Sequence, residues 1–213
     1  MGIKERQERD RDAVRRSILD AARELFVAEG YQNVSIRKIA ERVEYSPAAL
    51  YGYFPSKDDI FFALAEEGFR LLADPGRPET LDGLPPIERI RARFRRLYDF
   101  SQDHPQYFAL MFVDRSVPRI SREYERFSFA HETKVHILSE LQACIDEGVF
   151  PKSVDPFVAF RVLTMGLLGV AVMRLSERLA PGENADHLAD DVLNVTIAGL
   201  QAGGPLLSER VPC

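Results

Sequence analysis

Cysteine is scarce in this chain, which contains only Cys144 and Cys213 among its 213 residues. Two cysteines are too few for the disulfide framework of a small secreted protein. Cys144 falls within a helical pattern, and Cys213 is the last residue. We interpret Cys144 as a packing residue, because a redox switch needs an exposed thiol with a lowered pKa.

Long apolar runs are also missing. The most apolar stretch, residues 157–175, is interrupted by Arg161 and Arg174, and the run between them is much shorter than the roughly 20 residues of a bilayer span. The first residues, MGIKERQERDRD, are charged and lack the apolar segment of a secretory signal. We therefore expect a cytoplasmic protein without a membrane partner.

The sequence lacks the short signatures of common enzymes. It contains no GxSxG, P-loop or HExxH motif and no Cys/His group with metal-site spacing, and its four histidines are scattered. We predict no enzyme activity, no cofactor and no metal site. The alternative is a catalytic cluster assembled only by folding, which a screen for substrate turnover would detect.

Apolar residues recur at spacings of three and four almost throughout, and hardly any segment alternates with period two. This pattern predicts an all-α fold. Helix boundaries are marked by Gly30 as a stop signal and by Ser46 followed by Pro47 as a start signal. The helices are expected near residues 12–29, 35–43, 46–54, 56–72, 87–104, 105 onward, 120–145, 155–180 and 184–202.

The net charge of −5 is unevenly distributed. Residues 1–57 contain 11 basic and 9 acidic side chains, whereas the remainder contains 17 basic and 24 acidic side chains. A slightly basic head on an acidic body is expected of a protein that contacts DNA with one end only.

Residues 30–57 predict two short helices joined by a tight turn at residues 44–46. The second helix is too short to form a core alone, and Leu50 and Phe54, four residues apart, hold it against the preceding helix. Its outward positions are small residues and tyrosines: Pro47, Ala48, Ala49, Tyr51 and Tyr53. Such a face approaches base edges closely while hydroxyls reach phosphates. The alternative is an exposed helical hairpin, since many bundles contain such turns.

This stretch resembles the DNA-binding domain of the TetR family of bacterial transcriptional regulators. The matching residues are Gly30-Tyr31, Ser35-Ile36-Arg37-Lys38-Ile39-Ala40, Ser46-Pro47 and Leu50-Tyr51-x-Tyr53-Phe54-x-x-Lys57. The resemblance implies a homodimeric regulator, more often a repressor, that a small-molecule effector releases from pseudo-palindromic double-stranded operator DNA. It implies a helix-turn-helix DNA-binding domain over residues 1–56 and a larger helical effector-binding and dimerisation domain over residues 57–213.

The resemblance also implies roles for individual residues. Arg37 is expected to contact a base or a phosphate, and Tyr51 and Lys57 are expected to contact the DNA backbone. Ser35 is expected to cap its helix and to meet a phosphate, capping being the favoured single role. The full set of expected DNA-binding residues is Ser35, Arg37, Ser46, Pro47, Ala48, Ala49, Tyr51, Tyr53 and Lys57.

Two positions depart from the family pattern. Glu44 stands where the family usually has a glycine in the turn, and glycine favours a positive φ there. We therefore expect a different turn conformation or mild strain. Gly52 stands where the family often has an aromatic residue or a histidine, which removes one DNA contact. Specificity is then expected to depend on Arg37, Tyr53 and DNA shape.

Two apolar segments late in the chain predict a homodimer through helices near residues 156–180 and 184–202. The first is apolar on nearly all sides and carries Gly166 and Gly169, which permit close helix approach. A domain of this size cannot easily bury both segments internally, and the family pairs through the same region. The alternative is a self-contained bundle core.

The effector is expected to be hydrophobic or aromatic. Its candidate contacts are Phe94, Tyr98, Tyr107, Phe108, Met111, Phe127, His131 and Met165. Each of these is more often a core residue than a ligand contact, and His131 is favoured as a core histidine with a hydrogen-bond partner.

Three further expectations concern charged surfaces and a rival function. Residues 1–11 mix basic and acidic side chains and are favoured as a flexible arm, with contact to DNA as the alternative. Arg89, Arg93 and Arg96 share one helical face, which favours a solvated surface over a second nucleic-acid site. The alternative function is that of a helical architectural or protein-interaction module that needs no effector.

Overall fold

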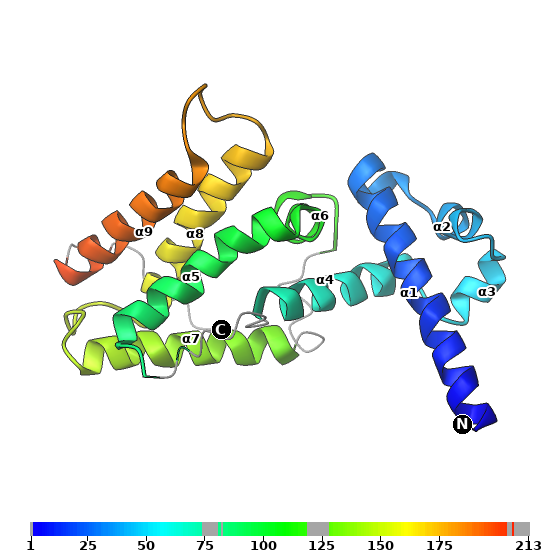
Figure 1. Cartoon of the computed structure of the whole chain (residues 1–213), viewed down its shortest axis with the longest axis horizontal. Coiled ribbons are helices and arrows are strands. Elements are labelled where there is room, and N and C mark those ends of the chain that lie inside the picture. Colours follow the sequence, from blue (N-terminus) through cyan, green and yellow to red (C-terminus); the bar gives the residue numbers. More distant parts are fainter. Residues whose placement is uncertain (1, 74–80, 82, 119–127, 204–205, 207–213) are drawn as a thin grey trace. The chain divides into compact units, whose positions relative to one another are not determined.

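The computed structural model describes residues 2–73, 81, 83–118, 128–203 and 206. Every regular element within these residues is a helix, which confirms the predicted all-α class (Figure 1). The chain forms two compact units: the first comprises residues 1–69 and 106–128, and the second comprises residues 70–105 and 129–213. Phe127, Cys213 and most of residues 74–86, between two of the expected helices, lie outside the described residues.

The first unit begins with α1 (Ile3–Glu29), which starts about nine residues earlier than the sequence predicts. The Glu5 carboxylate accepts a hydrogen bond from the Gly2 N–H at 2.9 Å, and Arg9 Nε donates to the Glu5 carbonyl at 3.3 Å. These contacts occupy a backbone N–H and a backbone carbonyl at the start of the helix. Residues 3–11, which we expected to form a flexible arm, are therefore helical.

The remaining elements of the first unit are η1 (Tyr31–Asn33), α2 (Ile36–Arg42), α3 (Pro47–Tyr51), most of α4 (Lys57–Ala73), most of α6 (Pro105–Phe108) and η2 (Ala109–Val113), a short π-helical segment. Helix α2 packs against α1, and α3 packs against α2 (Figure 1). The core of this group of helices is apolar, as the periodicity predicts. Its most buried members are Ile18, Ala22, Phe26, Ile39, Ala40, Leu50, Ile60, Phe61 and Leu64.

Residues 106–113 are integral to the first unit although they follow α5 in the chain. Arg23 of α1 donates a hydrogen bond to the Tyr107 hydroxyl at 2.8 Å, and its guanidinium lies 5.0 Å from the Tyr107 ring centroid. Gly68 of α4 lies so close to the Met111 sulfur that any side chain there would clash with it. Tyr107, Phe108 and Met111 are buried as a result.

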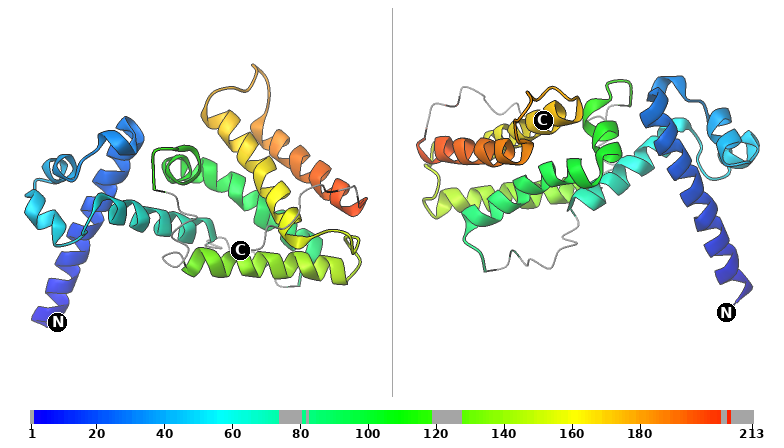
Figure 2. Two further views of the ribbon diagram at one scale, coloured as in Figure 1. Left: turned by 180° about the vertical axis from the view of Figure 1, so that it is seen from behind. Right: turned by 45° about the horizontal axis from the view of Figure 1, so that its top comes forward.

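The second unit consists of α5 (Pro86–Asp103), most of α7 (Ser128–Asp146), α8 (Pro156–Leu175) and α9 (Ala185–Gln201). Figure 2 shows α8 and α9 side by side, with α5 packed against α8. The Asp155 side chain caps α8 by accepting from the N–H groups of Phe157 and Val158, at the start that the sequence predicts. The absence of a side chain at Gly166 permits the α8–α9 contact, because a methyl group there would lie 2.6 Å from Val192 Cγ1.

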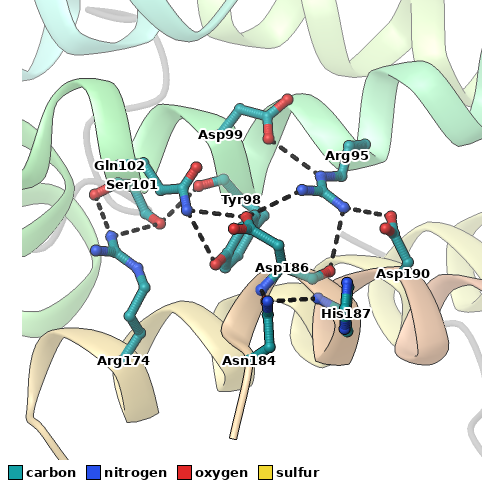
Figure 3. Close-up of polar contacts among 10 residues, drawn as sticks. All are labelled: Arg95, Tyr98, Asp99, Ser101, Gln102, Arg174, Asn184, Asp186, His187 and Asp190. Carbon is teal, nitrogen blue, oxygen red and sulfur yellow. Dashed lines mark hydrogen bonds and ion pairs between the residues drawn. The ribbon is translucent and has the colours of Figure 1, made fainter. Parts of the chain in front are cut away.

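A polar network ties the start of α9 to α5 (Figure 3). Arg95 donates to Asp99 of its own helix at 3.1 Å and to the Asp186 carboxylate at 3.2 Å, and it also pairs with Asp190. Gln102 donates to the same Asp186 carboxylate at 3.0 Å. A single guanidinium thus links two helices through several charge-assisted hydrogen bonds, which fixes the position of α9 on the bundle.

Two sequence interpretations concern residues of this unit. Cys144 is fully buried, and burial raises the pKa of its thiol to about 11, with the charge of Glu147 adding to the effect. This environment agrees with a packing role. Among the described residues, α8 alone is long and apolar enough to cross a membrane by length and composition, and a third of its most apolar window is buried within the chain.

Candidate nucleic-acid interface

The first element of the candidate interface is α2, which presents one apolar and one charged face. Ile39 and Ala40 are fully buried, whereas the Arg37 side chain on the opposite face is 81% exposed and pairs with Glu41 at 3.0 Å. The Ser35 hydroxyl accepts from the Lys38 N–H at 3.2 Å, so Ser35 caps α2 as predicted. Arg37 can exchange its exposed partner for another anion at little cost.

The turn after α2 keeps the backbone conformation that usually requires glycine. Glu44 has a φ of 59°, in the left-handed region, and the Tyr45 N–H donates to the Ala40 carbonyl at 2.9 Å. A side chain in this region costs roughly 1–2 kcal/mol. Of the two expected outcomes, the turn therefore shows mild strain at Glu44 and not a different conformation.

Helix α3 follows this turn and is shorter than predicted, ending at Tyr51 instead of near Phe54. The Ser46 hydroxyl accepts from the Ala49 N–H at 3.1 Å, which makes Ser46 the cap of α3. Leu50 and Phe54 are buried as predicted, and residues 52–54 continue as a turn in which the N–H groups of Tyr53 and Phe54 donate to the Leu50 carbonyl.

The outward face of α3 is made of small side chains and one large polar one. Pro47 and Ala48 are exposed, Ala49 is half-buried and Tyr51 is 55% exposed. Their exposure agrees with the prediction that these residues point outward while Leu50 is buried. Such a face allows the backbone of α3 to come close to a flat surface, with the Tyr51 hydroxyl reaching outward.

Two arginines of α1 lie beside the end of α3. The sequence offers DNA contact only as the alternative for the charged N-terminal run that contains them. The Arg11 guanidinium is 5.9 Å from the Tyr53 ring centroid, and the Arg15 guanidinium is 4.9 Å from the Phe54 ring centroid. Because acidic residues surround them in the sequence, these arginines look like part of a run of mixed charge. Their spacing of four, which places both on one side of a continuous helix, is the signal that could have revealed them.

Lys57 has contacts within the fold that the sequence does not predict. Its ammonium donates to the carbonyls of Tyr31 at 2.8 Å and Val34 at 2.9 Å and lies 4.1 Å from the Tyr31 ring centroid. The Tyr31 hydroxyl in turn donates to Asp58, and burial, with this hydrogen bond, raises the pKa of Tyr31. Lys57 therefore joins α4 to the segment before α2, and its contact with DNA stays a prediction.

The expected effector contacts are divided between the two units. Tyr107, Phe108 and Met111 are buried in the first unit, whereas Phe94 and Tyr98 are buried in the second. The Phe94 ring lies 5.9 Å from the Phe160 ring of α8, which identifies it as a core residue. In the parts of the chain that the structure describes, no three His, Cys, Asp or Glu side chains gather as a metal site requires.

His131 and Met165 are exposed, unlike the other described effector candidates. The prediction that His131 is a core histidine is wrong, because α7 turns the residues near its start outward. The helix buries Leu141 and Ile145, about three and four turns later, instead. Met165 lies on the outer side of α8 with 59% of its surface exposed.

Comparison with known proteins assigns the chain to a family. Residues 18–64 match the model of bacterial regulatory proteins of the tetR family, and residues 90–196 match the model of the tetracyclin repressor-like C-terminal domain. The second match alone covers half of the chain. The protein belongs to the TetR family of bacterial regulatory proteins, which confirms the resemblance seen in residues 30–57.

Several curated relatives are transcriptional repressors. The chain is 34% identical over 108 residues to the HTH-type transcriptional repressor KstR of Rhodococcus jostii, covering 48% of this chain and 50% of that protein. It is 25% identical over 194 residues to the HTH-type transcriptional repressor SCO4008 of Streptomyces coelicolor, covering 86% and 93%. The first four curated relatives are matched over only 32% to 60% of their length.

Solved structures share the fold. The fatty acid degradation regulator FadR of Bacillus halodurans aligns with a TM-score of 0.69 at 16% identity, covering 87% of this chain and 95% of that chain. The TetR family transcriptional regulator PfmR of Thermus thermophilus aligns with a TM-score of 0.66 at 23% identity, covering 86% and 98%. These likenesses confirm the predicted architecture, a helix-turn-helix region followed by a larger helical part.

Proposed function

We propose that the protein is a homodimeric transcriptional repressor whose α2–turn–α3 motif docks on double-stranded operator DNA. The observation that carries this proposal is the outward face of α3, where Pro47, Ala48 and Tyr51 are exposed. The helix itself is capped by Ser46 and held by the buried Leu50. A major groove admits such a helix, and small side chains leave the approach unobstructed.

Within this docking, phosphate contacts position the motif and Arg37 reads a base. A guanidinium fork binds O6 and N7 of guanine together, which discriminates against other bases by roughly 1–3 kcal/mol. Tyr51 contacts the backbone, and Arg11 and Arg15 add positive charge along the same side. The predicted contacts of Ser35, Ser46, Ala49, Tyr53 and Lys57 belong to this proposal.

The proposal requires two copies, paired through α8 and α9. Three apolar side chains on these helices are exposed within one chain: Met165 at 59%, Met173 at 40% and Val195 at 73%. Gly169 has no neighbouring atom within reach of an added side chain, so α8 is open to a second helix there. A two-fold pair would present two α3 helices to a pseudo-palindromic operator.

The paired chains would have two conformations that differ in the distance between their DNA-binding units. Release from DNA would follow when the effector binds the conformation that does not fit the operator. A ligand shifts such an equilibrium only as far as it prefers one of the two states. The proposed effector is hydrophobic or aromatic, as the residue types of the predicted contacts indicate; Phe94 itself packs on Phe160 as a core residue. An architectural module, the rival function, would bind DNA with no response to any small molecule. We expect the protein to act in the cytoplasm, where its DNA lies.

The test is a polarisation assay at fixed salt on DNA upstream of the coding gene and its neighbours, with random duplex as reference. Arg37→Ala is expected to weaken specific binding about 5- to 100-fold more than non-specific binding. Tyr51→Phe and Lys57→Ala are expected to weaken both. Arg178→Ala, an exposed arginine of the second unit, is the matched control. Unchanged operator affinity in all three interface variants would show that the docking is wrong.

A further inference from the structure

A polar hollow of about 400 Å³ lies between α5 and α7 in the second unit. Arg89 and Arg93 of α5 line one side, and His136, Ser139 and Glu140 of α7 line the other. Leu81 and Ala143 add apolar surface. None of the expected effector contacts that the structure describes lines this hollow. Its volume is within the range of small-molecule sites.

Glu140 organises the two arginines. It is only 7% exposed; Arg93 Nε donates to its Oε2, and Arg89 Nε lies 3.6 Å from its Oε1. Arg89 Nη1 is also held by the Leu84 carbonyl at 2.9 Å. The expectation that Arg89 and Arg93 form a solvated face is wrong, because a buried carboxylate on α7 draws both guanidinium groups inward. Their side chains are only 26% and 27% exposed.

Among the described residues that line the hollow, two guanidinium groups face one carboxylate, an excess of one positive charge. Each guanidinium has five N–H donors in a planar fork. The bonds described for Arg93 use Nε, toward Glu140, and Nη2, which lies 2.8 Å from His136 Nε2. Because arginine only donates, His136 Nε2 accepts in this arrangement. The arginines thus keep N–H groups beyond those that fix their position.

We propose that this hollow binds a small organic acid carrying one carboxylate. The carboxylate would accept hydrogen bonds from Arg89 and Arg93, and the remainder of the molecule would lie against Leu81 and Ala143. The charge of Glu140 balances one arginine, so a second negative charge on the ligand is disfavoured. The arginine forks match carboxylate and phosphate alike. The adjoining apolar surface and the charge of Glu140 are therefore what favour a singly charged organic acid over phosphate.

The site is tested by isothermal titration of the full-length protein without DNA, so its failure leaves the proposed operator binding untouched. The probes are hexanoate and benzoate, their neutral counterparts hexanamide and benzamide, and inorganic phosphate. The acids are expected to bind at least about tenfold more tightly than the amides, since hydrogen bonds to a charged group contribute about 1.5–3 kcal/mol.

Variants on α5 separate this site from a general charge effect. Arg93→Gln is expected to weaken hexanoate and benzoate at least about tenfold, whereas Arg91→Gln, on the same helix but bound to Asn194, is expected to change binding less than about twofold. Because Arg93→Gln leaves buried Glu140 with one partner fewer, the double variant Arg93→Gln with Glu140→Gln repeats the measurement without that charge, after circular dichroism confirms the fold.

Loss of acid binding in the double variant supports the site. Three results would overturn it: no saturable binding of either acid to the unmodified protein, equal binding of acid and amide, or equal losses in the Arg93 and Arg91 variants. Phosphate binding as tightly as the acids would also overturn the assignment, because it would show an anion site that makes no use of the apolar surface.

Discussion

Two exposed surfaces of this protein differ in composition, and the difference indicates what each one meets. The outward face of α3 has small residues and Tyr51, with Arg11 and Arg15 nearby. The outward sides of α8 and α9 instead expose the apolar side chains of Met165 and Val195. The first surface suits a polyanion, whose binding depends on salt. The second suits another apolar surface, whose burial removes it from water.

The comparison predicts that DNA binding and dimer formation can be disrupted independently. Changes on α3 and its neighbours should alter DNA affinity and its salt dependence without altering the oligomeric state. Changes on the outer side of α9 should alter the oligomeric state first and DNA affinity only as a consequence. The following variants test this separation.

The largest effect is expected from Val195→Arg. A charge in the centre of the proposed pairing surface should yield monomers in sedimentation equilibrium, and operator affinity should fall at least about 100-fold because one α3 helix loses its linked partner. Val135→Arg on α7 is the matched control, since Val135 is also exposed, at 52%, and should leave the dimer intact. A Val195→Arg protein that remains dimeric would contradict the assignment of α9.

A second effect separates folding from DNA contact at Lys57. Lys57→Met removes the donor to the Tyr31 and Val34 carbonyls and should lower the free energy of unfolding by about 1–3 kcal/mol. Lys38→Met, which breaks a half-exposed pair with Glu29, should cost less than about 1 kcal/mol. Urea unfolding followed by far-UV circular dichroism measures both; equal losses would remove the structural role of Lys57.

A smaller effect is expected from Arg11→Ala combined with Arg15→Ala. If these residues meet phosphates, the slope of log affinity against log salt should become shallower by about 1–2. The control pair Lys152→Ala with Arg178→Ala removes two exposed charges from the second unit and should leave the slope unchanged. A salt titration in the polarisation assay distinguishes them, and identical slopes would restrict the interface to α2 and α3.

The smallest effect concerns the turn before α3. Glu44→Gly should raise the free energy of unfolding by up to about 1 kcal/mol, because relief of the left-handed strain slightly exceeds the entropy that glycine adds to the unfolded chain. Glu41→Gly, inside α2, should instead destabilise the protein by about 1 kcal/mol. Thermal unfolding by circular dichroism compares the two, and a destabilised Glu44→Gly protein would refute the strain.

Features set by neighbouring residues could be predicted from the sequence. Ser35 and Ser46 cap α2 and α3 as predicted, and Leu50 and Phe54 are buried, since capping and apolar spacing are local rules. The start of α1 is an exception. The contact between Glu5 and Gly2 is local, but a mixed charge run is as typical of a disordered tail as of a helix, so the sequence does not distinguish the two.

Features that depend on distant partners could not be predicted. Lys57 finds its carbonyl partners 23 and 26 residues earlier, and Arg93 finds Glu140 47 residues later. A helical pattern shows which residues share a face but not which element covers that face. For this reason Arg93 was expected to be solvated, and His131 was expected to be buried. The pairing surface and the interface residues themselves remain predictions that only the variants above test.

The place of residues 106–113 has a practical consequence for dissecting this protein. Because Tyr107 and Met111 pack on α1 and α4 while α5 belongs to the other unit, the polypeptide passes between the units more than once. A fragment truncated after α4 would therefore lack part of its own hydrophobic interior and expose the side of α1 that holds Tyr107. A study of the first unit in isolation should therefore include residues 106–118.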